Sequence, residues 1–167
     1  MYKTLLSAVA AFSMILSVSA ASAQDVWSYS VKFVCGAAQT DPREIPIVEP
    51  GFYATEINIH NYRPEPVEIR KQVILIVQDN EAVGREPNFV GVSGEDGIAL
   101  PPNTATMDDC LRIREIAGVD TSNLTIGYLV LQSTQEINVD AVYTTTGGEA
   151  GQFPPSIEVE RIEGDQI

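Results

Sequence analysis

The sequence has few of the residues on which most catalytic and metal centres depend. Its 167 residues include one histidine, two cysteines and one tryptophan. This leaves little material for histidine-based catalysis or for a transition-metal site. Only 10 lysine and arginine residues stand against 23 aspartate and glutamate residues, and the net charge of −13 disfavours binding to nucleic-acid phosphates or anionic lipid. The sequence therefore predicts no cofactor, no resident metal and no nucleic-acid partner.

The first residues have the pattern of a cleaved export signal. Lys3 supplies a positive start, an apolar stretch runs from residue 5 to residue 18, and Ala21-Ser22-Ala23 matches a signal-peptidase site. The apolar stretch is short and rich in small residues, which is unfavourable for a membrane span. We therefore expect residues 1–23 to be removed and the protein to be exported to the bacterial periplasm or the cell exterior. An uncleaved anchor is the alternative.

The two cysteines, Cys35 and Cys110, both follow this signal. In an oxidising compartment an even pair of cysteines is most simply a disulfide. The alternative is a reactive thiol or a metal ligand, but the negative charges of Asp108 and Asp109 beside Cys110 disfavour a thiolate. We predict a Cys35–Cys110 disulfide.

Alternation of apolar and polar residues predicts a chain built of strands. Alternating segments lie at residues 26–35, 52–60, 137–143 and 157–160 and in the first half of 67–78. The second half of 67–78 and residues 126–131 are apolar on both faces, as in central strands, and short strands are expected at 89–92 and 104–107. Asp108 or Asp109 is expected to cap one short helix that ends near Ala117, with Gly118 as its stop. Seven or eight strands with one small helix predict an all-β fold, a single antiparallel immunoglobulin-like β-sandwich over residues 24–163, followed by a frayed tail at 164–167.

One residue interrupts the alternation. Lys71 falls on the apolar side of the strand expected at residues 67–78. Either a bulge shifts the register there, or an acidic residue pairs with the lysine. We expect the bulge.

Several segments together resemble a known group of proteins. They are Lys32–Gly36, Gly51–Thr55, Ile57–Asn61, Asp109-Cys110, Val139–Thr144 and Ser156–Glu160. Their arrangement resembles a family of secreted bacterial β-sandwich proteins of unassigned activity, and the Leu100-x-Pro corner resembles that of bacterial immunoglobulin-like modules. The resemblance implies a fold and a bacterial envelope setting, and it brings no catalytic residues. Trp27 departs from antibody-type domains, because it precedes both cysteines instead of lying between them.

Candidate chemistry is sparse. His60 shares the polar side of its strand with Glu56 and Asn58, and no G-x-S-x-G motif supplies a nucleophile, so we expect a solvated histidine. Acidic pairs occur at Asp79/Glu81, Glu95/Asp96 and Asp108/Asp109. Such carboxylates could perform acid–base chemistry or bind Ca²⁺, or they could be solvated loops and a helix cap. The segment from Asp79 to Gly84 starts like a calcium loop, but it lacks ligands at later positions.

The strongest candidate contact is the connection at residues 61–66, Asn61-Tyr62-Arg63-Pro64-Glu65-Pro66. Its prolines reduce the entropy lost on binding, and tyrosine and arginine are enriched in interface hot spots. The alternative is an ordinary turn, with Tyr62 folded over the core edge and Arg63 paired with carboxylates. We therefore expect a non-enzymatic binding or structural module of the bacterial envelope, which contacts a protein or another envelope component through Tyr62 and Arg63. A carboxylate-based hydrolase that uses calcium is the alternative function.

Overall fold

The computed structural model describes residues 25–38, 46–147 and 155–167. The predicted export signal at residues 1–23 lies outside these ranges. The elements follow one another as β1 (Trp27–Ala38), β2 (Gly51–Asn61), β3 (Val67–Gln78), β4 (Glu81–Ala82), β5 (Val92–Leu100), β6 (Thr104–Asp109), α1 (Cys110–Ala117), β7 (Thr125–Ser133), β8 (Asn138–Gly147), β9 (Ser156–Ile162) and β10 (Asp165–Gln166). The predicted all-β class with one short helix is confirmed.

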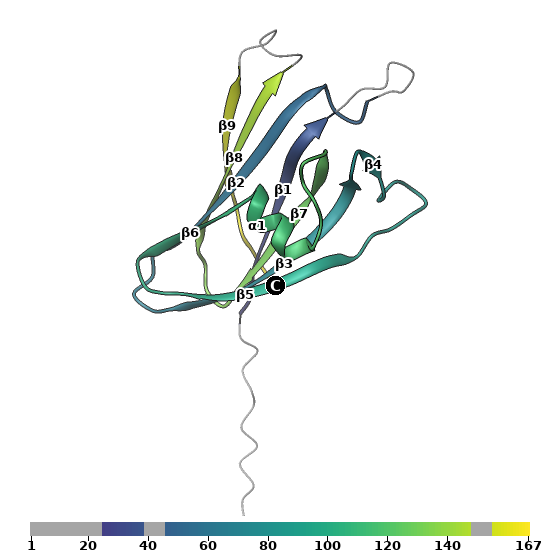
Figure 1. The fold of residues 1–167 in the computed structure, drawn as a ribbon. Coiled ribbons are helices and arrows are strands. Elements are labelled where there is room, and N and C mark those ends of the chain that lie inside the picture. The colour runs from purple at the N-terminus through teal and green to yellow at the C-terminus, as the bar shows by residue number, and fades with distance from the viewer. Residues whose placement is uncertain (1–24, 39–45, 148–154) are drawn as a thin grey trace, which may run out of the picture.

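The ten strands form one connected antiparallel sheet that does not close on itself. Its main path runs β4-β3-β7-β1-β2-β8-β9, while β5 pairs with β3, β6 with β2 and β10 with β1. Strand β1 joins two groups of strands, one that contains β7, β3, β4 and β5 and one that contains β2, β6, β8 and β9. Its residues 27–35 pair with β7, and its residues 36–38 pair with β2. Figure 1 shows β9, β8 and β2 to one side, β7, β3 and β5 to the other, and α1 between them.

Both groups of strands contribute to the same hydrophobic core. Its completely buried members come from strands on both sides of β1 and from α1: Val31, Phe33, Cys35, Ile57, Ile59, Val67, Val73, Ile113, Leu129, Leu131, Val139 and Ala141. On β2, for example, Ile57 and Ile59 face inward while Asn58 and His60 face outward, as strand alternation requires.

Helix α1 begins and ends as its sequence predicts. The side chain of Asp109 accepts a hydrogen bond from the Arg112 amide at 2.9 Å, and Gly118 adopts a left-handed conformation with φ of 68°. Ile113 is completely buried. The helix therefore packs one apolar side against the strands, immediately after the second cysteine.

Strand β5 is longer than its sequence indicates. The short strand expected at residues 89–92 is wrong except at Val92, because residues 89–91 form no strand, whereas β5 spans Val92–Leu100 and includes two glycines. At Gly94 the strand passes so close to α1 that a Cβ atom would overlap the carbonyl oxygen of Ile116. Glycine normally weakens a strand, and here it permits the close approach of helix and strand backbones.

The C-terminal residues are held in the sheet instead of fraying. Strand β10 pairs with Trp27 and Ser28, and the Ile167 amide donates to the carbonyl oxygen of Val26 at 2.8 Å. The expected frayed tail at 164–167 is thus replaced by an ordered strand.

Lys71 is buried and paired, so the expected bulge at this residue is wrong. Its Nζ lies 2.7 Å from both carboxylate oxygens of Asp108, and each side chain is only 2% exposed. The register shifts of β3 occur further along, between Val73 and Ile74 against β5 and between Leu75 and Val77 against β7. The acidic partner, which was the other expectation, comes from β6 across the core.

Candidate functional site

The connection between β2 and β3 is fixed by one buried side chain. Asn61 is completely buried, and its Nδ2 donates to the carbonyl oxygens of Glu65, Leu100 and Pro101 at 2.9 to 3.0 Å. Its Oδ1 accepts from the Arg63 amide at 2.9 Å. These bonds tie the β2–β3 connection to the β5–β6 corner, so the backbone at residues 62 and 63 is held from both sides.

Tyr62 and Arg63 are oriented by Glu136, which lies in the β7–β8 connection. The Tyr62 hydroxyl donates to Glu136 Oε2 at 2.9 Å, and Arg63 Nη2 donates to the same oxygen at 3.0 Å. Arg63 Nε also donates to the Glu136 carbonyl oxygen at 3.2 Å. The Arg63 guanidinium lies 4.8 Å from the centre of the Tyr62 ring, within cation–π range. We call Tyr62, Arg63 and Glu136 the tip cluster.

The tip cluster is partly exposed and electrostatically balanced. Tyr62 remains 38% exposed, and the Arg63–Glu136 ion pair is open to solvent on one side. Desolvation, and then the hydrogen bond to Glu136, raises the pKa of Tyr62. The sequence placed Tyr62 and Arg63 together, but Glu136 is 73 residues from Arg63 and no local pattern identifies it.

His60 lies at the exposed side of β2, next to the tip cluster. Its ring centre is 6.5 Å from that of Tyr62. Its predicted companions bond to each other, with Asn58 Nδ2 donating to Glu56 Oε1 at 2.9 Å. The contacts of His60 are thus those of a surface residue.

Most of the paired carboxylates noted in the sequence have structural partners. The Glu95 pKa is lowered, mainly by hydrogen bonds from Arg70 and then from Gln72. The backbone amide of Gly97, and after it Arg112, lowers the Asp96 pKa. The others bind within the fold: Asp79 to Asn123, Asp108 to Lys71, and Asp109 to the α1 backbone. Within residues 25–38, 46–147 and 155–167, no cluster of three or more histidine, cysteine, aspartate or glutamate side chains is placed to hold a metal ion.

The predicted disulfide is confirmed. Cys35 in β1 is bonded to Cys110, the first residue of α1, and their Cα atoms are 5.7 Å apart. Cys35 is completely buried, and the Thr55 amide donates to Cys110 Sγ at 3.3 Å. The bond anchors the helix to β1 and β2 in the core.

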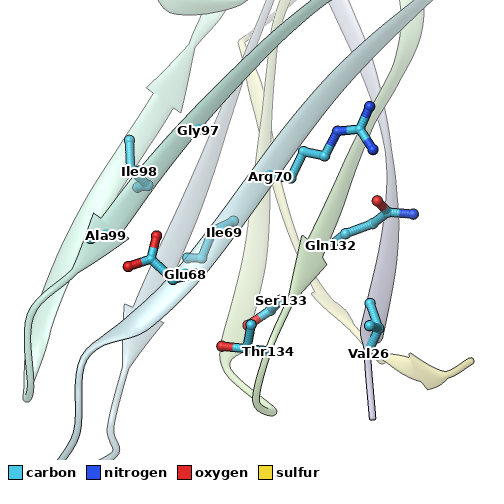
Figure 2. Close-up of a pocket in the computed structure, with 10 residues that line it drawn as sticks. All are labelled: Val26, Glu68, Ile69, Arg70, Gly97, Ile98, Ala99, Gln132, Ser133 and Thr134. Atoms are coloured by element: carbon cyan, nitrogen blue, oxygen red, sulfur yellow. The ribbon is translucent and has the colours of Figure 1, made fainter. Parts of the chain in front are cut away.

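Two hollows lie on the strands, and neither is evident from the sequence. One, of about 430 Å³, is formed by β3, β5 and β7. Figure 2 shows Glu68 and Arg70 at its β3 side and Gln132 at its β7 side. Gly97 and Ala99 of β5 also line it, and its polar side chains are one acid, one base, one amide and the hydroxyls of Ser133 and Thr134.

The second hollow, of about 270 Å³, lies between β1 and the inner surfaces of β2, β8 and β9. Lys32, Tyr53, Tyr143 and Glu158 line it. Burial, followed by the hydrogen bond to Glu160, raises the pKa of Tyr143 to about 12. The Tyr143 hydroxyl also donates to the Lys32 carbonyl oxygen at 3.1 Å, so this side chain bridges the two parts of the sheet.

Comparison with known proteins gives no family. No protein-family model matches the chain, and no curated protein matches it. Among solved structures the chain resembles the crystal structure of Thermotoga maritima 1070, with a TM-score of 0.46 and 8% identity over 85% of this chain and 95% of that one. No helix in the described part of the chain is both long and apolar enough to cross a membrane. The resemblance to secreted bacterial β-sandwich proteins stays a prediction.

Proposed function

We propose that this protein is an exported, non-enzymatic binding or structural module of the bacterial envelope. Its partner is a protein or another envelope component, contacted through Tyr62 and Arg63. The observation that carries this proposal is the fixed geometry of the tip cluster: Asn61 holds its backbone, and Glu136 orients both side chains. A contact that is rigid before binding loses little conformational entropy when the partner arrives.

The finer architecture and the cellular location belong to the same proposal. Two groups of strands that share one core support an immunoglobulin-like sandwich, in which end loops commonly carry binding residues. The Cys35–Cys110 disulfide is consistent with export to an oxidising compartment. The structural partners of the paired carboxylates favour a binding role over a carboxylate-based hydrolase.

The proposal is tested by retention of a partner from envelope extract. The double variant Tyr62→Ala, Arg63→Ala should lose at least about tenfold in affinity for any retained component, a change of about 1.4 kcal/mol. Its melting temperature should hardly change, because an exposed ion pair contributes about 0–1 kcal/mol. The retained component must then be purified and its affinity measured with both proteins.

A matched control is available in the connection that follows β4. Phe89 is 91% exposed and Arg85 is also exposed, so Arg85→Ala, Phe89→Ala removes the same two kinds of side chain elsewhere. This control should retain the partner. The assignment of the contact to Tyr62 and Arg63 would be refuted if the Tyr62→Ala, Arg63→Ala variant retained the partner as well as the wild type does. It would also be refuted if the control variant alone lost the partner.

A further inference from the structure

Strand β9 lies at one end of the sheet, and among residues 25–38, 46–147 and 155–167 no strand pairs with its outer edge. Its seven residues pair continuously with β8, from Ser156 opposite Thr145 to Ile162 opposite Val139. Figure 1 shows β9 at the outside of the group that it forms with β8 and β2. In the described part of the chain β8 is the one strand that pairs with it. A row of backbone N–H and C=O groups on β9 therefore points away from the sheet.

Several other edges in the described part of this sheet are short or contacted by other groups, whereas the six-residue strand β6 (Thr104–Asp109) has, like β9, one paired side. Strands β4 and β10 have two residues each. Helix α1 packs against β5 at Gly94. On the free side of β1, Thr55 Oγ1 bonds to the Val34 amide and carbonyl, and Tyr143 bonds to the Lys32 carbonyl. Strand β9 is of ordinary strand length and contains no proline or lysine. Its charged residues Glu158, Glu160 and Arg161 disfavour pairing with an edge of like charge, so they select a strand of complementary charge.

The outward side of β9 carries two exposed apolar residues and then Arg161, which pairs with Asp140 of β8 at 3.5 Å. Ile157 and Val159 are 71% and 67% exposed, and Phe52 of β2 is 66% exposed. Register places them on one face, since Ile157 lies opposite Thr144, Val159 opposite Val142, and Phe52 opposite Thr146. We call these three side chains, which come from β2 and β9 and have residues of β8 between them, the outward apolar patch.

The inward side of β9 is acidic. Glu158 and Glu160 alternate with the apolar residues, both are exposed, and Glu158 lines the smaller hollow beside Tyr143. A strand added to β9 would place alternate side chains next to the apolar patch and the remaining ones next to these two glutamates.

A second copy of this chain fits this edge poorly. Two β9 strands paired with each other would bring glutamates close together, on a chain whose net charge is already −13. The apolar patch is also small, since its three side chains expose roughly 400 Å² against the roughly 800 Å² per partner of a stable complex. An extended peptide needs less apolar area, because main-chain hydrogen bonds to the edge supply much of the affinity.

We propose that β9 is a docking edge for an extended peptide segment in which apolar and basic residues alternate. The peptide adds as a further strand, its apolar side chains cover Ile157 and Val159, and its lysine or arginine side chains pair with Glu158 and Glu160. This site is separate from the tip cluster, so Tyr62→Ala, Arg63→Ala should leave peptide binding unchanged.

Three synthetic peptides test the proposal by isothermal titration calorimetry. The first alternates valine and lysine, the second has the same composition in two blocks, and the third repeats the first with every second backbone amide N-methylated. The first peptide should bind and should slow hydrogen exchange at β9. The other two should bind at least about tenfold more weakly, because one loses the register and the other loses the edge hydrogen bonds.

A pair of protein variants separates local recognition from bulk attraction. Glu158→Lys should weaken the first peptide by about tenfold, whereas Glu65→Lys, an equal charge change at an exposed residue of the β2–β3 connection, should weaken it by less than about twofold. The proposal is overturned if the first peptide does not bind, or if the block peptide or the N-methylated peptide binds as tightly as the first. It is also overturned if Glu158→Lys and Glu65→Lys weaken binding of the first peptide equally. Self-association of the wild-type protein that slows hydrogen exchange at β9 would also overturn it, in favour of a second copy.

Discussion

Replacing Lys71 by methionine should destabilise the protein strongly, because Asp108 would become an unpaired carboxylate in the core. Both side chains are 2% exposed, and the Lys71 ammonium lies 2.7 Å from both oxygens of Asp108. Oδ1 accepts a hydrogen bond from it, whereas Oδ2 makes the charge contact without an aligned hydrogen bond. The pair is therefore close but incompletely satisfied.

The expected magnitude follows from this burial. Removing one partner of a buried ion pair costs about 3–5 kcal/mol, so Lys71→Met and Asp108→Leu should each lower the free energy of unfolding by that amount. The double variant Lys71→Met, Asp108→Leu should be within about 1 kcal/mol of the wild type or more stable, because packed apolar residues carry no desolvation penalty. The two effects should thus be strongly non-additive.

The neighbouring residue on β3 provides the control. Arg70 bonds to Glu95 at 2.8 Å, but these side chains are 55% and 48% exposed. Arg70→Met should therefore cost only about 0–1 kcal/mol. Urea unfolding of the wild type, the three single variants and the double variant measures all these values. A cost below about 1 kcal/mol for Lys71→Met, or equal costs for Lys71→Met and Arg70→Met, would refute the reasoning.

Three further predictions concern the core and the smaller hollow. Replacing Cys35 and Cys110 by alanine should lower the free energy of unfolding by about 2–5 kcal/mol in urea titration, and a change below about 1 kcal/mol would contradict the stabilising role of the disulfide. Gly94→Ala should lower the free energy of unfolding by at least about 1–3 kcal/mol, because the new Cβ overlaps the Ile116 carbonyl. Gly97→Ala should lower it by less than about 0.5 kcal/mol, because the nearest atom to the new Cβ is 3.7 Å away. Tyr143 has a pKa of about 12 against 10.0 for an ordinary tyrosine, so the unfolded chain releases this proton first and stability should fall as the pH rises from 10 to 12. Tyr143→Phe should remove that loss of stability, and it should remove the tyrosinate absorbance change that occurs at the highest pH in a titration. An unchanged titration would contradict the assignment of this raised pKa to Tyr143.

The sequence predicts well those strands in which the apolar residues of the pattern are also the residues buried in the core. Residues 52–60 alternate, and residues 67–78 alternate before they become apolar on both faces; the structure has β2 and β3 at Gly51–Asn61 and Val67–Gln78. The caps of α1 are also local, because the side chain of Asp109 and the left-handed Gly118 act within a few residues. The disulfide followed from cysteine count and compartment alone.

Features that depend on distant partners were missed. A buried lysine violates the apolar pattern of its own strand, and only the fold shows that Asp108, 37 residues away, neutralises it. Similarly, the glycines of β5 suggest a loop until α1 is placed against Gly94. At the tip cluster the sequence supplied Tyr62 and Arg63 but could not supply Glu136, since the β7–β8 connection reaches that position only after the sheet has formed.

Strand β9 shows why a candidate binding surface is harder to predict than a strand. Alternation of Ile157 and Val159 with Glu158 and Glu160 predicts a strand with an apolar side, which normally faces the core. Pairing with β8 decides otherwise: Val159 lies opposite Val142 on the outer face, while Glu160 lies opposite the completely buried Ala141. The alternation of apolar and polar residues is a property of the local sequence, but pairing with the neighbouring strand decides which of the two sets faces the core. An apolar side turned to solvent at a free edge is therefore a structural finding, and it is the observation from which a binding partner for this protein can be sought.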